Sequence, residues 1–508
     1  MLDASVADTM SHGIYTHAPV SAEEFFNDVR AVGRRILRYA STDYLNRYLT
    51  ADFVDLVCSS IASNRAVSQA DFYRAVWASA PSGAAATTVA LGVLGAADTS
   101  EAADRLHDLV DDCRGRGLSV SGSNIGWGRQ VSTTLIGVQL RALAPFLGPS
   151  DQLRYRVWSP TPLKPHRSCE RTARPLRNVP ALLWRELSLR LAWPALAVGH
   201  TQLRSALSVA VSIVGTRLTL SDAAYRLGSA TTGPATSRIL QILRTSALWP
   251  EMSAVLIRLA TYLDESPPPI DYTSRRALPY AGLLSDMEWF QICGRTGTPP
   301  GRGVKARVVR CWLYERLSGS PAMHCPGAHV TAEFRSKLAD FPRHLTPELL
   351  NHLDEAAQRF LVSHGRRGEP ITWCPPVPVD DLIAPAGVLG GVDPTNVRRL
   401  IRDEQLSIEQ AARRLGAAPE AIRHLLETSP LAVCFTTAQR RARGLVLVDA
   451  RAALSEADFI DRYHRRRQSL RDIAHVIGVS RQTISRLAHT YGIALRPPCR
   501  PQRATHQA

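Results

Sequence analysis

A ten-residue pattern that occurs three times constrains the fold of this 508-residue chain more than any other feature. The copies align without gaps and lie at residues 219–228 (TLSDAAYRLG), 407–416 (SIEQAARRLG) and 469–478 (SLRDIAHVIG). Each begins with a Ser or Thr that can cap a helix and ends with Gly, which adopts the left-handed conformation at little cost. Because apolar residues recur between these ends at helical spacing, each copy predicts a short helix closed by a turn.

The last copy continues into a second predicted helix. Ser480 is placed to cap it, and Ile484, Leu487 and Ala488 form its buried face. Two short helices joined by a glycine-containing turn outline a helix-turn-helix, whose second helix enters the DNA major groove by its N-terminal residues. The candidate DNA-binding residues on this helix are Ser480, Arg481, Gln482, Thr483, Ser485 and Arg486. Arg pairs bidentately with guanine and Gln with adenine. The alternative is a helical hairpin that packs on its neighbours and touches no DNA.

The charge of the chain favours nucleic acid as its partner. The net charge is +16 and the pI is near 9.9, which favours nucleic acid over a membrane surface. Arg465, Arg466 and Arg467 directly precede the last copy, and residues 460–508 hold ten Arg against only Asp461 and Asp472. Charge of this density suits phosphate contact, although a solvated basic tail has the same composition. We therefore expect double-stranded DNA as the partner and a cytoplasmic, nucleoid-associated protein.

The other two copies differ where contact with DNA would occur. In the middle copy Glu420 stands where the last copy has Gln482, and a carboxylate would face phosphates unfavourably. We expect this copy to bind DNA weakly or to serve in packing. After the first copy, residues 229–233 form an insertion, and a helix from Pro234 should expose Arg238, Gln241 and Arg244. This copy is compatible with either role.

The sequence predicts an all-α protein of several domains. The expected regions are an N-terminal helical domain of unknown role (1–152), a helical domain with the first copy (153–374), a middle module (375–452) and a C-terminal module (453–508). Helices are expected at residues 23–39, 53–61, 70–78, 102–112 and 133–143, and a short strand at 444–448. Residues 153–180 are basic and proline-interrupted, which favours a solvated linker over a DNA-contacting arm.

Several kinds of site lack their signatures in this sequence. The nine Cys include no CxxC pair, and the cluster His324, Cys325 and His329 lacks the paired spacing of structural zinc sites, so no metal is expected. Residues 295–303 (RTGTPPGRG) do not match a phosphate-binding loop. No catalytic arrangement and no cofactor motif is recognised. The N-terminus does not resemble a secretory signal, and the most apolar windows are too short for a membrane span, so no membrane association is expected.

Several segments resemble the TniQ-type proteins of bacterial transposons, in their actinobacterial form. The segments are NVPALLW (178–184), LTLSDAAYRLG (218–228), RRAL (275–278), GTPPGRG (297–303), CWLYERLSG (311–319) and the last helix pair with its ending YGI (491–493). The resemblance covers roughly residues 170–495. It implies a non-enzymatic protein that binds DNA and helps a transposase choose its target, with a transposition ATPase and the transposase as partners. Many relatives carry an N-terminal zinc-binding region, which this sequence lacks.

The leading hypothesis is therefore a DNA-binding protein of TniQ type that takes part in target-site selection or DNA recognition during transposition. The alternative is a helix-turn-helix transcriptional regulator with no link to a transposase. An enzyme such as a recombinase forms a third class. Its chemistry requires metal-binding carboxylates, or an activated Ser or Tyr among several Arg, in an arrangement that this sequence does not show.

Overall fold

A computed structural model describes residues 9–63, 79–118, 131–165, 176–192, 197–301, 303–329, 331–376, 392–432 and 446–496. These residues are predominantly helical, and the one sheet among them pairs β1 (Thr9–Met10) antiparallel with β2 (Val20–Ser21), with Met10 opposite Val20. The predicted all-α class is confirmed. The chain divides into two compact units, which comprise residues 1–277, 318–321 and 373–390, and residues 278–317, 322–372 and 391–508. The predicted domain boundaries stay predictions.

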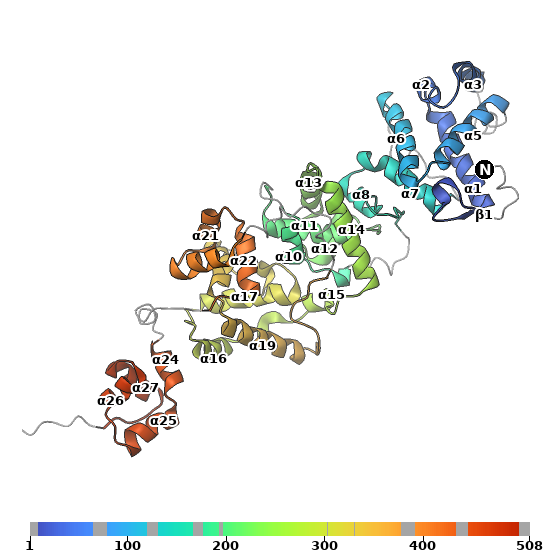
Figure 1. Cartoon of the computed structure of the whole chain (residues 1–508). Coiled ribbons are helices and arrows are strands. Elements are labelled where there is room, and N and C mark those ends of the chain that lie inside the picture. Colours follow the sequence, from blue (N-terminus) through green and yellow to red (C-terminus); the bar gives the residue numbers. More distant parts are fainter. Residues whose placement is uncertain are drawn as a thin grey trace, which may run out of the picture. The chain divides into compact units, whose positions relative to one another are not determined.

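The first unit begins with a helical core in which α1 packs against α5 (Figure 1). Its helices are α1 (Ala22–Tyr39), α2 (Thr42–Leu45), α3 (Ala51–Ser63), α5 (Ala80–Leu94), α6 (Thr99–Gly115), α7 (Thr133–Leu143) and α8 (Pro149–Arg154), with 3-10 turns η2 (Gly13–Tyr15) and η3 (Ala144–Phe146). A buried carboxylate joins three of these segments. Asp28 accepts hydrogen bonds from the Tyr15 hydroxyl (2.7 Å) and from the backbone N–H (2.9 Å) and hydroxyl (2.5 Å) of Ser132. The expected helix at residues 70–78 lies outside the described residues, and the other four are present.

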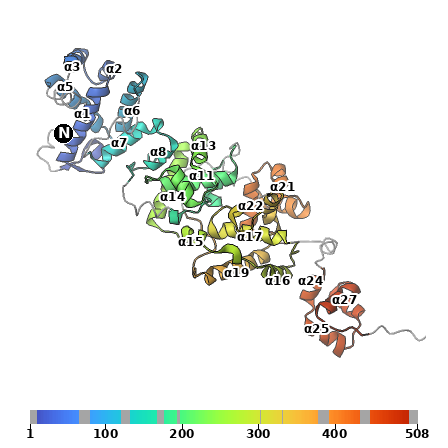
Figure 2. The ribbon, with the colours of Figure 1, turned by 180° about the vertical axis from the view of Figure 1, so that it is seen from behind.

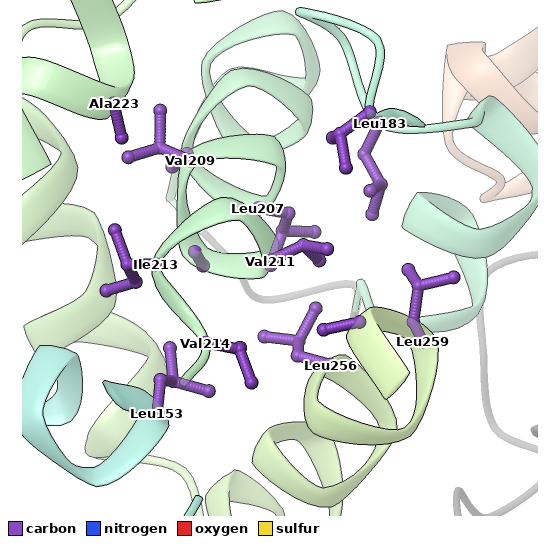
Figure 3. Close-up of a cluster of buried hydrophobic side chains, with 14 of the residues drawn as sticks. Leu153, Leu183, Leu207, Val209, Val211, Ile213, Val214, Ala223, Leu256 and Leu259 are labelled. Atoms are coloured by element: carbon purple, nitrogen blue, oxygen red, sulfur yellow. The ribbon is translucent and has the colours of Figure 1, made fainter. Parts of the chain in front are cut away.

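The second part of this unit packs around the buried helix α11. Its helices are α10 (Arg185–Arg190), α11 (His200–Ile213), α12 (Leu220–Leu227), α13 (Gly233–Arg244), α14 (Trp249–Glu265) and α15 (Tyr272–Arg276). Every residue of α11 from Leu203 onward is buried, because α8, α10, α12, α13 and α14 all contact this helix. Figure 3 shows side chains of these neighbours around α11, among them Leu153, Ala223 and Leu256.

Several segments that resemble TniQ proteins form hydrogen bonds within this core. The Asn178 side-chain amide donates to the carbonyl of Leu263 (2.8 Å), and the Leu182 N–H donates to the carbonyl of Gly319 (2.8 Å). The Trp184 indole N–H donates to the Tyr272 hydroxyl (3.1 Å). These hydrogen bonds satisfy groups that are buried or half-buried, and they therefore help to stabilise the fold.

The second unit holds three hydrophobic clusters among its described residues. Several of the helices that form them are labelled in Figure 2. The first is formed by η4 (Tyr280–Gly282), α16 (Asp286–Thr296), α17 (Val304–Ser318), η5 (Ala322–His324), α18 (Ala332–Asp340), η6 (Phe341–His344) and α19 (Pro347–Ser363). The second contains α20 (Pro394–Arg398), the π-helical turn η7 (Arg399–Asp403), α21 (Ile408–Leu415) and α22 (Pro419–Thr428). The third contains α24 (Val446–Ala453), α25 (Glu456–Ile460), the π-helical turn η8 (Asp461–Arg465), α26 (Leu470–Ile477) and α27 (Arg481–Thr490).

The short strand expected at residues 444–448 is wrong from Val446 onward, where α24 begins. Residues 444 and 445 lie outside the described residues. The apolar run suggested a strand, but it leads into Asp-Ala-Arg-Ala-Ala, and α24 packs on α27 with Ala450 buried. Tertiary contact on one helical face thus outweighs the β propensity of the valines. Among the described residues, no helix has both the length and the apolar character needed to cross a bilayer.

Candidate nucleic-acid interface

The three copies of the pattern form three helix pairs with the same local geometry. In each pair the first helix is capped by a hydroxyl that accepts the backbone N–H three residues later, from Thr219, Ser407 or Ser469. Each first helix ends at a glycine in the left-handed region, Gly228 (φ 62°), Gly416 (φ 63°) or Gly478 (φ 77°). The two helices of every pair contact each other. The local geometry that the pattern predicts is therefore present in all three copies.

The two C-terminal pairs belong to a longer repeat that the sequence reasoning missed. Each pair is preceded, at one constant offset in sequence, by a short α-helix and a π-helical turn, α20 with η7 and α25 with η8. A non-glycine residue in the left-handed region follows each turn, Gln405 (φ 57°) or Arg467 (φ 52°). Aligning residues 393–428 with 455–490 without gaps would have found this repeat, because their apolar positions Val397 and Phe459 coincide.

The last pair lies in a four-helix body that we call the terminal module, residues 446–496. Phe459, Ile484 and Leu487 are fully buried in its core. Two contacts fix the chain after α27. The Tyr491 hydroxyl donates to the carbonyl of Leu454 (2.7 Å), and the guanidinium of Arg496 lies 4.2 Å from the centre of the Tyr463 ring. The module therefore has its own core, with α27 packed on α24 and α26 (Figure 1).

The polar face of α27 points to solvent. Arg481, Gln482 and Arg486 are exposed, while Thr483 and Ser485 are half-buried. The Ser480 hydroxyl accepts the Thr483 N–H (3.1 Å) and caps the helix as expected. Within the described part of the chain, the side chains of Arg481, Gln482 and Arg486 make no hydrogen bond or ion pair. Their donors are available for an external partner.

The three predicted phosphate-binding arginines are all exposed and lie at the end of η8 and in the turn after it. The Arg466 side chain forms an ion pair with Asp461 (2.8 Å). Arg467 holds the left-handed position, and its carbonyl accepts a long bond from the Arg496 guanidinium (3.4 Å). The turn η8 contacts α26, so Arg465 and its neighbours border the same helix pair.

In the middle pair, the helix that corresponds to α27 is α22, and other parts of the second unit contact it. The Arg423 guanidinium donates to the carbonyl of Ala339 (2.7 Å), pairs with Glu409 (3.3 Å) and contacts Glu420. The Trp312 indole N–H donates to the Glu427 carboxylate (3.0 Å). No side chain caps α22, which starts from Ala418 and has Pro419 as its first residue. This pair is used for packing, one of the two roles expected for it.

The first pair shows one difference from expectation. Arg238 and Gln241 of α13 are exposed as predicted. Arg244 is not, because it is half-buried and donates to the carbonyl of Pro145 (2.5 Å). The prediction for Arg244 is therefore wrong: helical spacing placed it on the outer face, but a distant segment of the same unit reaches it there.

The cluster of His and Cys residues lies where η5 ends. Cys325 is buried beside Cys311, and the hydrogen bond between the two thiols, together with burial, raises the pKa of Cys325. His329 is instead in contact with Arg307. In the residues that the structure describes, no three His, Cys, Asp or Glu side chains converge as a metal site would require.

Part of the basic connector also falls within the described residues. Lys164 is exposed, but partial desolvation and the nearby charge of Arg35 lower its pKa to about 8. Most of the remaining basic residues of this segment, at positions 166–175, lie outside the described residues. The solvated linker expected for this segment therefore stays a prediction.

The comparisons with known proteins found no match for this chain. No family model matches the chain, and neither the curated proteins nor the solved structures include a significant match.

Proposed function

We propose that this protein is a non-enzymatic DNA-binding protein of TniQ type, which inserts α27 into the major groove and helps target-site selection or DNA recognition in transposition. The observation that carries the proposal is the outer face of α27. Its Arg481, Gln482 and Arg486 side chains are exposed and uncommitted, on a helix whose other face is the core of the terminal module. A capped helix with free base-reading side chains near its N-terminus suits major-groove recognition.

The two C-terminal repeats support this proposal by their contrast. They share the cap of the first helix, the turns and the helix lengths. Residues 393–428, however, carry six Arg and six acidic residues, whereas residues 455–490 carry seven Arg and four acidic residues. In the middle repeat Arg423 forms ion pairs with Glu409 and Glu420 inside the protein. The equivalent face of α27 has no carboxylate. A helix pair that packs inside the protein can carry carboxylates on this face, whereas a surface that contacts phosphates should not.

The proposed partner is double-stranded DNA, with Arg465, Arg466 and Arg467 as backbone contacts. Phosphate contacts position a protein, while contacts with base edges give it sequence preference. The transposase and the transposition ATPase are proposed as further partners from the resemblance to TniQ proteins alone, and so is the place of the protein in the cytoplasm, at the nucleoid.

Substitutions in the terminal module test the DNA-binding proposal. Duplexes preferred by the full chain are selected from a random pool, and binding is measured by fluorescence anisotropy. Arg481→Ala or Arg486→Ala should cost about 1–3 kcal/mol on the preferred duplex if the residue makes a bidentate contact, and relax the preference at one position. Replacing Arg465, Arg466 and Arg467 together by Ala should weaken binding to every duplex and lower the salt slope by about three.

The matched control is Arg413→Ala, which removes the same charge from an exposed position on α21 of the packing pair. If the terminal variants and this control bind all duplexes alike, the assignment of the terminal module is wrong. Chromatin precipitation with sequencing then separates the two biological roles. Occupancy at insertion points supports a role in transposition, and occupancy confined to promoters supports the transcriptional regulator.

A further inference from the structure

We propose that the first helix pair carries a second DNA-contacting surface. This α12–α13 surface consists of Arg217, Tyr225, Arg226, Arg238 and Gln241, all of them exposed. The inference rests on the proposed function in one respect, because it takes duplex DNA as the partner of the chain. It goes beyond that function in assigning a separate site, in the first unit, to the same ligand.

The register of α13 supports this assignment. Counted from the caps Thr232 and Ser480, Arg238 occupies the helical position that Arg486 has in α27. Both guanidinium groups are exposed. Ser237 and Ser485 coincide in the same way. The first pair thus presents, at the same positions of a capped second helix, the Ser-Arg step that the terminal module presents on its reading helix, although the turn before α13 is two residues longer.

The start of α13 is fixed against α12 more closely than most residues would allow. A Cβ atom on Gly233 would lie 2.2 Å from Ser221 Oγ and 2.8 Å from its Cα, so only glycine fits. The Thr232 hydroxyl accepts the Ala235 N–H (3.4 Å), and the buried hydroxyls of Thr231 and Thr236 are bonded at 3.0 Å. The reading face is therefore held rigidly, which lowers the entropic cost of binding.

The charge around this surface is predominantly positive. Residues 217–246 contain four Arg and one acidic residue, Asp222, whose carboxylate accepts the Thr219 hydroxyl (2.7 Å) at the start of α12. Arg244 is committed to Pro145, but Arg217, Arg226 and Arg238 make no hydrogen bond or ion pair with other described residues.

The aromatic side chain on this surface adds a further hydrogen-bond donor. Tyr225 is 87% exposed beside Arg226, and its phenol can donate to a phosphate oxygen. Unpaired guanidinium groups together with an exposed phenol and an exposed amide are the donors that a DNA backbone and base edges require.

The experiment compares three variants of the full chain. The first-pair variant is Arg226→Ala, Arg238→Ala and Gln241→Ala, the terminal variant is Arg481→Ala and Arg486→Ala, and the third combines all five changes. Arg30→Ala is the control, because it removes an exposed charge from α1. Affinity is measured over a salt series on duplexes of about one and about four helical turns. Circular dichroism confirms that each variant retains its helical content.

We expect the first-pair variant to bind the long duplex about tenfold more weakly, with a salt slope lower by about two, and to keep its preference among sequences. The combined variant should lose more than either parent. Restoring the charges with Arg226→Lys and Arg238→Lys should recover the slope.

The possible outcomes distinguish the two proposals. If the first-pair variant binds like Arg30→Ala at every salt concentration while the terminal variant fails, the second surface is overturned and the proposed function stands. If the terminal variant binds normally while the first-pair variant fails, the second surface stands and the assignment of α27 is wrong. Equal binding by all variants would overturn both.

Discussion

Gly319 offers a test of how the core of the first unit is held together. Its φ is +66°, and a Cβ atom there would lie 2.5 Å from Cβ of Pro180 and 2.9 and 3.0 Å from two ring atoms of Tyr272. Its carbonyl accepts the Leu182 N–H. Gly319→Ala therefore combines an unfavourable backbone conformation with overlap against two rings. Gly228 is the matched control, because its φ is +62° and nothing lies within 4 Å of the added atom.

The two substitutions share the conformational cost and differ in the steric one. Placing a non-glycine residue in the left-handed region costs about 1–2 kcal/mol, reduced by the loss of freedom in the unfolded chain, so Gly228→Ala should destabilise by about 1 kcal/mol. Overpacking a core adds about 1–3 kcal/mol. The Tyr272 ring is held by the Trp184 indole and cannot move away without breaking that bond. We expect Gly319→Ala to cost about 2–4 kcal/mol.

Hydrogen exchange measured by mass spectrometry is the appropriate assay, because a chain with several cores does not unfold in a single step. Under conditions where exchange reports the opening equilibrium, the peptide that contains Leu182 should exchange about 30- to 1000-fold faster in Gly319→Ala and about 5-fold faster in Gly228→Ala. Peptides from α22 in the other unit should be unchanged. Equal acceleration by the two substitutions would refute the steric argument.

Two further predictions concern buried titratable groups. Burial raises the pKa of Asp28 above its ordinary value of 3.8, so this carboxyl stabilises the fold below pH 3.8, and the contribution is lost as the pH rises through the raised value. Asp28→Asn should remove this component from the pH dependence of unfolding, followed by urea titration, and an unchanged pH dependence would contradict the pKa assignment. Burial also raises the pKa of Cys293 to about 12, so its thiol should resist alkylation by iodoacetamide at pH 8, where mass spectrometry should find it modified only after denaturation. Rapid alkylation of the native chain would show that this side chain is accessible.

The sequence predicts the local geometry of the helix pairs well. Caps and terminating glycines act within one turn of the helix that they limit, so Ser469 and Gly478 could be assigned without knowing any distant contact. The same holds for α7, whose bounds match the predicted range. Features that depend on distant residues were not predictable. The acceptor for Arg244 lies ninety-nine positions earlier, and α24 is helical because it packs on α27.

The π-helical turns were not predicted from the sequence for a different reason. Nothing in a single window distinguishes η8 from an ordinary helix end, although its residue Tyr463 is buried in the core of the terminal module. The signal exists only in the comparison with η7, where Ile401 is buried at the equivalent place. Repeats of 20–50 residues therefore reveal structure that local propensity does not.

A DNA-binding surface needs both a well-positioned backbone and side chains that are available for contact, and the three helix pairs differ mainly in the second of these. A capped, rigid backbone is common to all three, so it cannot by itself decide which pair meets DNA. The side chains on the second helix distinguish the pairs: the Arg423 guanidinium of α22 is already bonded to carboxylates and a backbone carbonyl, whereas Arg238 and Arg486 are free of such partners among the described residues. A guanidinium bonded within the protein would have to give up those bonds before it could contact a phosphate, and that cost offsets most of the gain. Partner availability, rather than backbone shape, is therefore the physical basis for assigning DNA contact to α27 and α13 and packing to α22.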